Sequence, residues 1–129
     1  MEIETALNLL IVDDNAAVRR LMKRLVLPFA TEVCECADGA DALSAYEEQD
    51  PDVVLMDIRM KEVDGITAAK RIHAANPAAK IVMVTDYDDD ALREAALAAG
   101  ACGYVLKDNL LDLVRLMEAA LEGGPHRHP

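Results

Sequence analysis

Three short apolar runs in this chain each stop at a carboxylate or a hydroxyl. The runs are residues 9–12 before Asp13-Asp14, residues 53–56 before Asp57, and residues 81–84 before Thr85. Unbroken apolar runs of this length are typical of strands buried on both faces, as in a parallel sheet covered by helices. Ligands bind at the carboxyl ends of such strands. The pattern therefore predicts a polar site at one edge of a sheet, and Lys107, which follows Tyr104-Val105-Leu106, would join it.

Segments with helical apolar spacing alternate with these runs along the whole chain. Such alternation predicts an α/β fold with a parallel sheet and right-handed crossovers. The expected strands are 7–12, 31–37, 52–57, 80–84 and 103–107, and the expected helices are 16–27, 40–48, 65–75, 88–99 and 109–122. We expect one domain over residues 1–122, with 123–129 as a tail or the start of a linker.

The composition narrows the class of protein. The net charge of −11 argues against nonspecific nucleic-acid binding by this domain itself. Three cysteines without a C-x-x-C pair form neither a disulfide framework nor a zinc site, so we expect reduced core residues. No signal peptide and no apolar run long enough to span a bilayer is found, which predicts a cytoplasmic protein with no membrane contact.

Three carboxylates at one edge repel each other unless a cation lies among them. Mg²⁺ prefers one or two carboxylates together with water and phosphate oxygens. Beside them, a lysine ammonium and a threonine hydroxyl can bind further phosphoryl oxygens. Asp57 could act as the nucleophile, because carboxylates form acyl phosphates. The pattern indicates a site that handles phosphoryl groups, and the absence of a glycine-rich phosphate loop argues against a nucleotide substrate.

From Leu7 to Leu121 the chain resembles the receiver domain of bacterial two-component response regulators. It is most similar to the receivers that precede a helix-turn-helix output domain. The matching segments are Leu10 to Asp14, Met56 to Met60, Asp64-Gly65, Val84-Thr85 and Gly103 to Asp108. The resemblance implies a doubly wound, flavodoxin-like fold with five strands in the order 2-1-3-4-5 and five helices.

The resemblance also implies roles for the site residues. Asp57 would accept a phosphoryl group from a phosphohistidine of a sensor histidine kinase. Thr85 and Lys107 would bind the phosphoryl oxygens, and Tyr104 would be the switch aromatic that follows Thr85. The switch would alter the face formed by the helix at 88–99, the strand at 103–107 and the helix at 109–122, through which a homodimer is expected. The implied ligands of Mg²⁺ (or Mn²⁺) are Asp14, Asp57, the backbone carbonyl of Arg59 and, through water, Asp13.

Two positions depart from the family pattern near the site. Lys61 stands where the family usually has proline, which predicts a looser loop, and Asp86 stands where a small residue is usual. The Asp86 carboxylate would repel a phosphoryl donor and slow phosphorylation. Arg59 and Tyr87 occupy the two variable positions that, by resemblance, set the rate of autodephosphorylation, and their length predicts slow hydrolysis.

Other interpretations stay open at this stage. Asp13-Asp14 could serve only as a helix N-cap, and Tyr104 could be a static core residue. The chain could be a receiver-like interaction domain that never carries phosphate, supported only by Lys61 and Asp86. An aspartyl-phosphate phosphatase would need nucleophile and acid two residues apart after the first strand, and a flavin module would need a hydroxyl-rich loop there. Neither pattern is present.

Overall fold

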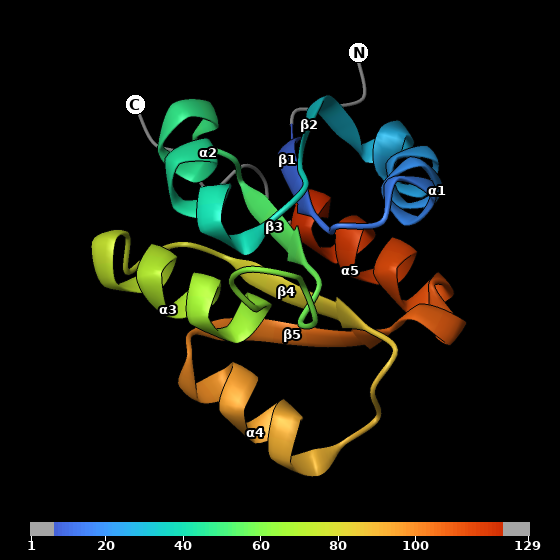
Figure 1. Ribbon diagram of the computed structural model, residues 1–129. Helices are drawn as coiled ribbons and strands as arrows, with labels where there is room; N and C mark the ends of the chain where they lie inside the picture. Colours follow the sequence, from blue (N-terminus) through green and yellow to red (C-terminus); the bar gives the residue numbers. More distant parts are fainter. Residues whose placement is uncertain (1–6, 123–129) are drawn as a thin grey trace.

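The computed structural model describes residues 7–122, which form a central sheet covered by helices on both faces (Figure 1). All four strand pairings are parallel, and the order is β2-β1-β3-β4-β5, which confirms the predicted topology. The strands are β1 (Leu7–Val12), β2 (Ala30–Cys36), β3 (Val53–Met56), β4 (Ile81–Thr85) and β5 (Ala101–Leu106).

Five α-helices connect the strands. They are α1 (Ala16–Val26), α2 (Ala42–Gln49), α3 (Gly65–Ala75), α4 (Asp90–Ala98) and α5 (Leu111–Glu122). Helices α1 and α5 lie on one face of the sheet, and α2, α3 and α4 cover the other face (Figure 1). This division follows from right-handed crossovers that begin at a central strand and wind outward in both directions.

Alternate residues of each strand feed two separate cores. In β1, Leu9 and Ile11 pack toward α1 and α5, whereas Leu10 and Val12 pack toward α2 and α3. Every residue of β3 and β4 is buried, as expected for central strands covered on both faces. The cores are almost entirely aliphatic, in keeping with an aromatic content of 3%. Tyr46 is the single aromatic residue among the buried core members in the described chain.

The bounds of β1 and α3 are as predicted, and the other element boundaries differ from the predictions by at most two residues, for local reasons. The side chain of Asp89 accepts a hydrogen bond from the Leu92 amide, so α4 begins at Asp90 rather than at residue 88. Strand β5 begins at Ala101 rather than residue 103, because Ala101 pairs with Ile81. Single 3-10 turns occupy Leu27–Phe29, Gly39–Asp41 and Lys107–Asn109. The helices predicted at 16–27, 40–48 and 109–122 each include part of one of these turns.

The prediction that all three cysteines are core residues was wrong. Cys102 is exposed and Cys34 is only partly buried, so Cys36 alone is a buried core cysteine; all three thiols are free. In α1, Met22 and Val26 are the buried residues, and the neighbouring Leu21 is 46% exposed. None of the described helices is long and apolar enough to cross a membrane. The predicted tail at 123–129 lies outside the described residues.

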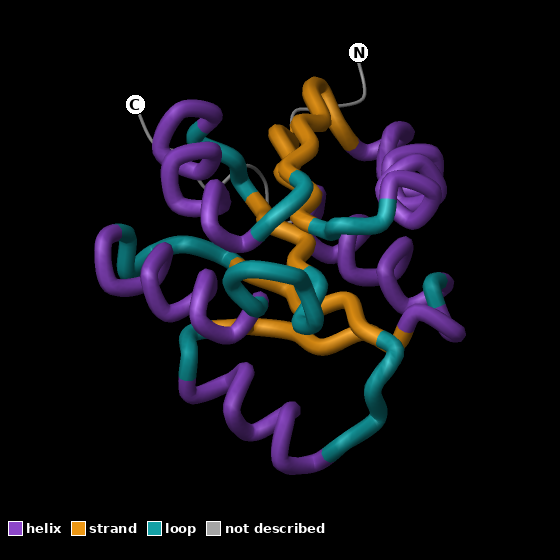
Figure 2. Tube along the Cα trace, in the orientation of Figure 1, coloured by secondary structure: helices purple, strands orange, loops and turns teal. Residues whose placement is uncertain are grey.

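The loops that follow β1, β3, β4 and β5 carry the polar side chains of interest. Figure 2 traces these loops between the strands and the helices. The strand ends are held in register, since the Asp57 amide donates to the Val12 carbonyl at 2.9 Å. The loop after β3 closes tightly: the Gly65 amide donates to the Ile58 carbonyl at 2.7 Å, and Asp64 caps α3 through the Thr67 amide.

Gly65 is a position where no side chain fits. A Cβ atom there would overlap the carbonyl oxygen of Asp57, which is backbone and cannot move aside without shifting the strand end. At Gly103, by contrast, a Cβ atom would make ordinary contacts at 3.4–3.6 Å with Val82 and Leu116.

We therefore expect Gly65→Ala to destabilise the protein by about 2 kcal/mol or more and Gly103→Ala to change stability by less than about 1 kcal/mol. Urea denaturation of both variants beside the wild type checks this. Equal unfolding midpoints for the two variants would show that the loop after β3 tolerates a larger residue.

Candidate functional site

Three carboxylates converge at the carboxyl edge of the sheet, as the sequence predicts. Asp13 and Asp14 follow β1, Asp57 follows β3, and one carboxylate oxygen from each lies within 4.8 Å of the others. Asp13 and Asp57 are buried, and Asp14 is exposed. Asn15, rather than either aspartate, caps α1 through the amides of Ala17 and Val18. The interpretation of Asp13-Asp14 as only a helix cap is therefore wrong.

Lys107 reaches this cluster from the turn that follows β5. Its Nζ lies 2.9 Å from Oδ2 of Asp13 and 3.4 Å from Oδ1 of Asp57, and its side chain is 14% exposed. One ammonium thus contacts two carboxylates that come from two different strand ends. Oδ2 of Asp13 is buried, and the Lys107 ammonium is its charged partner.

Burial and charge shift the pKa values of this group. The pKa of Asp57 is raised to about 6: burial raises it most, the nearby charge of Asp13 adds to that effect, and Lys107 opposes both. Burial by itself would lower the pKa of Lys107, but the carboxylates of Asp13 and Asp57 outweigh it and raise that pKa above its ordinary value. The site therefore contains more negative charge than its one lysine can balance.

Thr85 and Tyr104 are linked through the backbone of one residue. Thr85 is fully buried at the end of β4, and its Oγ1 accepts a hydrogen bond from the Tyr87 amide at 3.3 Å. The Tyr104 hydroxyl donates to the Tyr87 carbonyl at 2.6 Å, and the Arg93 guanidinium lies 4.3 Å from the centre of the Tyr104 ring. Arg93 also pairs with Asp88 at 3.1 Å. The predicted switch residues are thus joined, and Tyr104 is partly buried and packs against the core.

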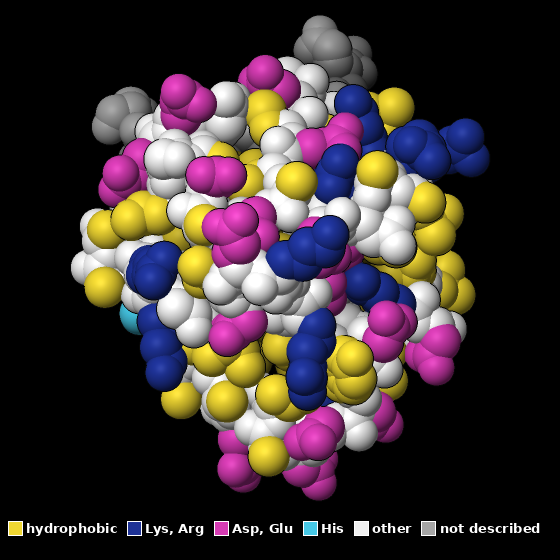
Figure 3. Space-filling view, viewed as in Figure 1, with side chains coloured by type: hydrophobic (Ala, Val, Ile, Leu, Met, Phe, Trp, Pro, Cys, Tyr) yellow, Lys and Arg dark blue, Asp and Glu magenta, His cyan; other side chains and the backbone are white. Residues whose placement is uncertain are grey.

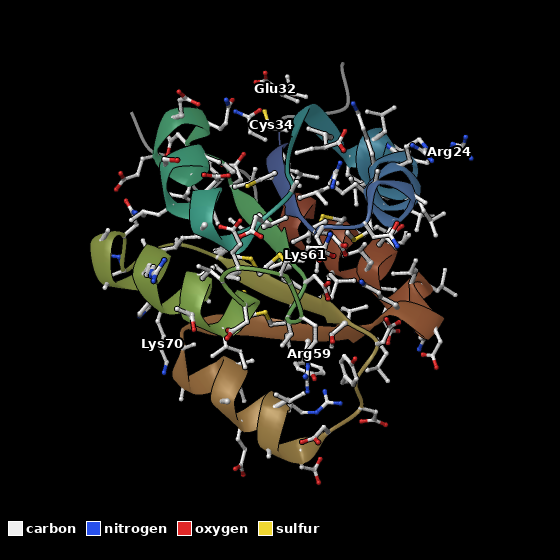
Figure 4. All side chains as sticks on the ribbon, in the orientation of Figure 1. Arg24, Glu32, Cys34, Arg59, Lys61 and Lys70 are labelled. Atoms are coloured by element: carbon white, nitrogen blue, oxygen red, sulfur yellow. The ribbon has the colours of Figure 1, made fainter. Side chains whose placement is uncertain are left out.

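The rim of the site carries exposed charged and aromatic side chains. The Arg59 guanidinium lies 4.8 Å from the centre of the Tyr87 ring, so the two predicted rate-setting residues are in contact. Asp86 and Lys61 are exposed. Figure 4 labels Arg59 and Lys61 on the loop between β3 and α3, and Figure 3 shows dark blue side chains in the middle of the same view.

The loop around Lys61 is tied to the neighbouring loop by Asp38, which the sequence did not single out. The Asp38 carboxylate accepts hydrogen bonds from the Ala40 amide at 2.7 Å and from the Glu62 amide at 3.2 Å. These bonds to backbone amides, the one from Ala40 foremost, lower the pKa of Asp38. Asp38-Gly39 is visible in the sequence as a turn, but a bond across 24 residues leaves no local signal.

The donors at this edge fit a hard divalent cation. They are carboxylate oxygens from Asp13, Asp14 and Asp57, the ligand type that Mg²⁺ and Mn²⁺ prefer. Oδ2 of Asp13 is paired with Lys107, and a carboxylate oxygen has a second lone pair that can bind a cation or a bound water. The acidic excess described above favours a cation for the same reason.

Comparison with known proteins agrees with this site. The model of the response regulator receiver domain matches residues 9–120. The chain belongs to the response regulator receiver domain family. This settles the fold class and the class of function: the protein is a receiver domain of two-component response regulators, with a phosphoacceptor signalling role.

The matched relatives differ in the share of their own length that this receiver covers. It is 38% identical over 112 residues to the chemotaxis protein CheY of Bacillus subtilis, spanning 86% of this chain and 92% of that protein. It is 32% identical over 129 residues to the transcriptional regulatory protein DegU of Brevibacillus brevis, spanning 98% of this chain but 55% of that protein. The receiver thus spans about half the length of several regulators that it matches.

A solved relative is similar over most of the fold. A chain in the crystal structure of the CheX-CheY-BeF3-Mg²⁺ complex from Borrelia burgdorferi superposes with a TM-score of 0.77 at 27% identity, with 88% of each chain covered. The family match and these relatives do not favour the alternative of a phosphate-independent interaction domain.

Because the pKa of Asp57 is raised, ionisation of this side chain lowers the stability of the metal-free protein. Between roughly pH 4 and pH 6 the native state keeps a proton that the unfolded chain has lost, so stability falls as pH rises through this window. We expect Asp57→Asn to stabilise the metal-free protein by about 1–3 kcal/mol at pH 7.5 and by nearly nothing at pH 4. Denaturation in EDTA at both pH values measures this, with Glu47→Gln on the exposed side of α2 as the control. A stabilisation that persists unchanged at pH 4 would contradict the assignment.

Proposed function

We propose that Asp57 is the phosphoacceptor of this receiver and takes its phosphoryl group from a phosphohistidine of a sensor histidine kinase. The observation that carries the proposal is the contact of one lysine with two carboxylates from separate strand ends. A single buried lysine among carboxylates is the arrangement that an incoming phosphoryl group needs, because its oxygens can replace the carboxylates as partners of the ammonium.

In the transfer step a carboxylate oxygen of Asp57 attacks the phosphorus atom. The O–P bond forms as the P–N bond to the histidine breaks, and the electron pair of that bond goes to the imidazole nitrogen. Lys107 binds one phosphoryl oxygen as a point charge, and the buried hydroxyl of Thr85 donates to another. Both groups come from strand ends, so they are positioned before the donor arrives.

Asp14, Asp57 and the Arg59 carbonyl would hold Mg²⁺ (or Mn²⁺), with Asp13 acting through a water molecule. When bound, the ion neutralises charge on the carboxylates and on the phosphoryl oxygens. The complex of the Borrelia relative, which contains Mg²⁺, supports this assignment for the present chain.

The same site would drive the switch. Thr85 Oγ1 now accepts from the Tyr87 amide, and Tyr104 donates to the carbonyl of that residue. If Thr85 turns to the phosphoryl group, it gives up the Tyr87 amide, and the segment that holds Tyr104 is released. The face formed by α4, β5 and α5 would then change shape, and we propose it as the surface for homodimerisation.

Two rim features would set the rates. Arg59 and Tyr87 contact each other, and at the rim of the site these two long side chains would shield the acyl phosphate from water, which favours slow hydrolysis. Asp86 adds negative charge at the same rim and would slow the approach of an anionic donor. The protein itself would catalyse both its phosphorylation and its dephosphorylation.

The matched relatives also support a proposal about the kind of protein in which this receiver acts. We propose a receiver over residues 1–122 of a cytoplasmic regulator, with 123–129 as a tail or the start of a linker. The similarity to DegU, a transcriptional regulatory protein that this chain spans by about half, supports a role in transcription regulation. We propose no nucleic-acid or membrane contact by the receiver itself, in keeping with its net charge of −11.

Intact-mass spectrometry after incubation with acetyl phosphate and Mg²⁺ tests the acceptor assignment. We expect a single phosphoryl adduct on the wild type and none on Asp57→Asn or in EDTA. Asp52→Asn is the matched control, because Asp52 is another buried aspartate that lies at the opposite end of β3. An adduct on Asp57→Asn would place the phosphoryl group elsewhere.

Asp86 is tested by the rate of the same reaction. We expect Asp86→Ala to be phosphorylated by acetyl phosphate about two- to fivefold faster than the wild type at low ionic strength. Glu94→Ala removes the same charge from the exposed side of α4 and should leave the rate within error of the wild type. Equal rates for Asp86→Ala and the wild type would show that Asp86 is no brake.

A further inference from the structure

A largely buried arginine on α1 reaches back to the loop that carries the acidic pair. Arg19 lies in the second turn of the helix, and its side chain is 17% exposed. Its Nη1 donates to the backbone carbonyl of Asp13 at 2.6 Å. A bond this short from a charged donor is among the stronger hydrogen bonds in proteins. Arg19 therefore contacts the backbone between the two carboxylates without contacting either carboxylate.

The guanidinium is held at its other end by the edge strand β2, which contributes no side chain to the acidic cluster. Arg19 Nε lies 2.9 Å from Oε1 of Glu35 on β2, and Lys23 Nζ approaches Oε2 of the same carboxylate at 3.8 Å. Arg19 thus spans α1, the loop after β1 and the edge strand β2. A planar group bonded at two ends has little freedom to turn, unlike a lysine ammonium.

The loop needs such support because its side chains repel each other. Asp13 and Asp14 are adjacent and share the site with Asp57. The backbone there is otherwise held by the Asp13 amide, which donates to the Cys36 carbonyl at 3.0 Å, and by the Asn15 amide, which donates to Oδ1 of Asp13 at 2.8 Å. Each of these bonds fixes Asp13 from its amide or its side chain, and Arg19 is the group that fixes its carbonyl.

We propose that Arg19, anchored by Glu35, is a positioning residue for the divalent cation. It holds the loop after β1 so that Asp13 and Asp14 stay directed toward Asp57 despite their mutual repulsion. This inference rests on the proposed function, since it assigns a supporting residue to the same site. Groups that orient metal ligands without touching the metal commonly change affinity by about tenfold or more.

The sign of the effect separates positioning from simple electrostatics. Arg19 is a cation close to a cation site, so its charge alone opposes the binding of a second cation. Removing that charge would tighten binding if electrostatics were its only role. If Arg19 positions the loop, its removal weakens binding in spite of the lost repulsion.

The experiment is a titration of Mn²⁺ followed by the EPR signal of the free ion. We expect Arg19→Gln to weaken Mn²⁺ binding about tenfold, and Arg19→Lys and Glu35→Gln to weaken it about three- to fivefold. Arg20→Gln is the matched control: it removes the same charge from the next residue of α1, which is exposed and has no hydrogen bond or ion pair within residues 7–122. It should bind Mn²⁺ as the wild type does, or slightly more tightly.

Arg19→Gln binding Mn²⁺ as tightly as the wild type, or more tightly, would overturn the inference. The proposed cation site is tested separately by Asp14→Asn, which should abolish most of the binding; wild-type protein that binds no Mn²⁺ would overturn the site itself. Thermal unfolding in EDTA establishes that each variant is folded. If Arg19→Gln is not, Arg19→Lys and Glu35→Gln decide, and wild-type affinity in both would overturn the inference.

Discussion

The repulsion among three carboxylates at one sheet edge is the constraint on which the rest of the site depends. Asp13, Asp14 and Asp57 lie close enough to share a ligand, and two of them are buried. Lys107 contacts both buried members and offsets part of that charge, yet the pKa of Asp57 remains raised. A site with this imbalance favours cations, and an arriving phosphoryl group finds a lysine whose partners it can replace.

The sheet makes this arrangement possible because its strands are parallel and buried on both faces. Consecutive strand ends then meet at one edge, while the helices that return the chain lie above and below the sheet. The acidic residues come directly after the strands, where the backbone is still tied to the sheet: the Asp57 amide donates to the Val12 carbonyl and the Asp13 amide to the Cys36 carbonyl. Burying these carboxylates destabilises the folded state, and the aliphatic packing of β3 and β4 beneath the site helps to offset that loss.

Charged side chains outside the cluster hold the loops that surround it. Asp38 binds the amide of Glu62 in the loop after β3, and Arg19 binds the carbonyl of Asp13 in the loop after β1. The prediction that Lys61, in place of proline, loosens its loop takes no account of the bond from Asp38, which restrains the same segment from a distance. The site therefore has an inner group of three carboxylates and a lysine. Around it, the charged side chains of Asp38 and Arg19 each bind a backbone group of a neighbouring loop.

Local pattern determined much of this protein. The apolar runs that stop at Asp13, Asp57 and Thr85 placed the three central strands and the acidic edge, and the alternation of strands with helices predicted the parallel arrangement, because burial on both faces and strand ends are encoded within a few neighbouring residues. Tertiary structure alone decided which charges pair across the fold. Arg19 with Asp13 and Glu35, Asp38 with Glu62, and the exposure of Leu21 and Cys102 depend on how separate elements meet. Such contacts join residues that are distant in the chain, and neither periodicity nor composition records them.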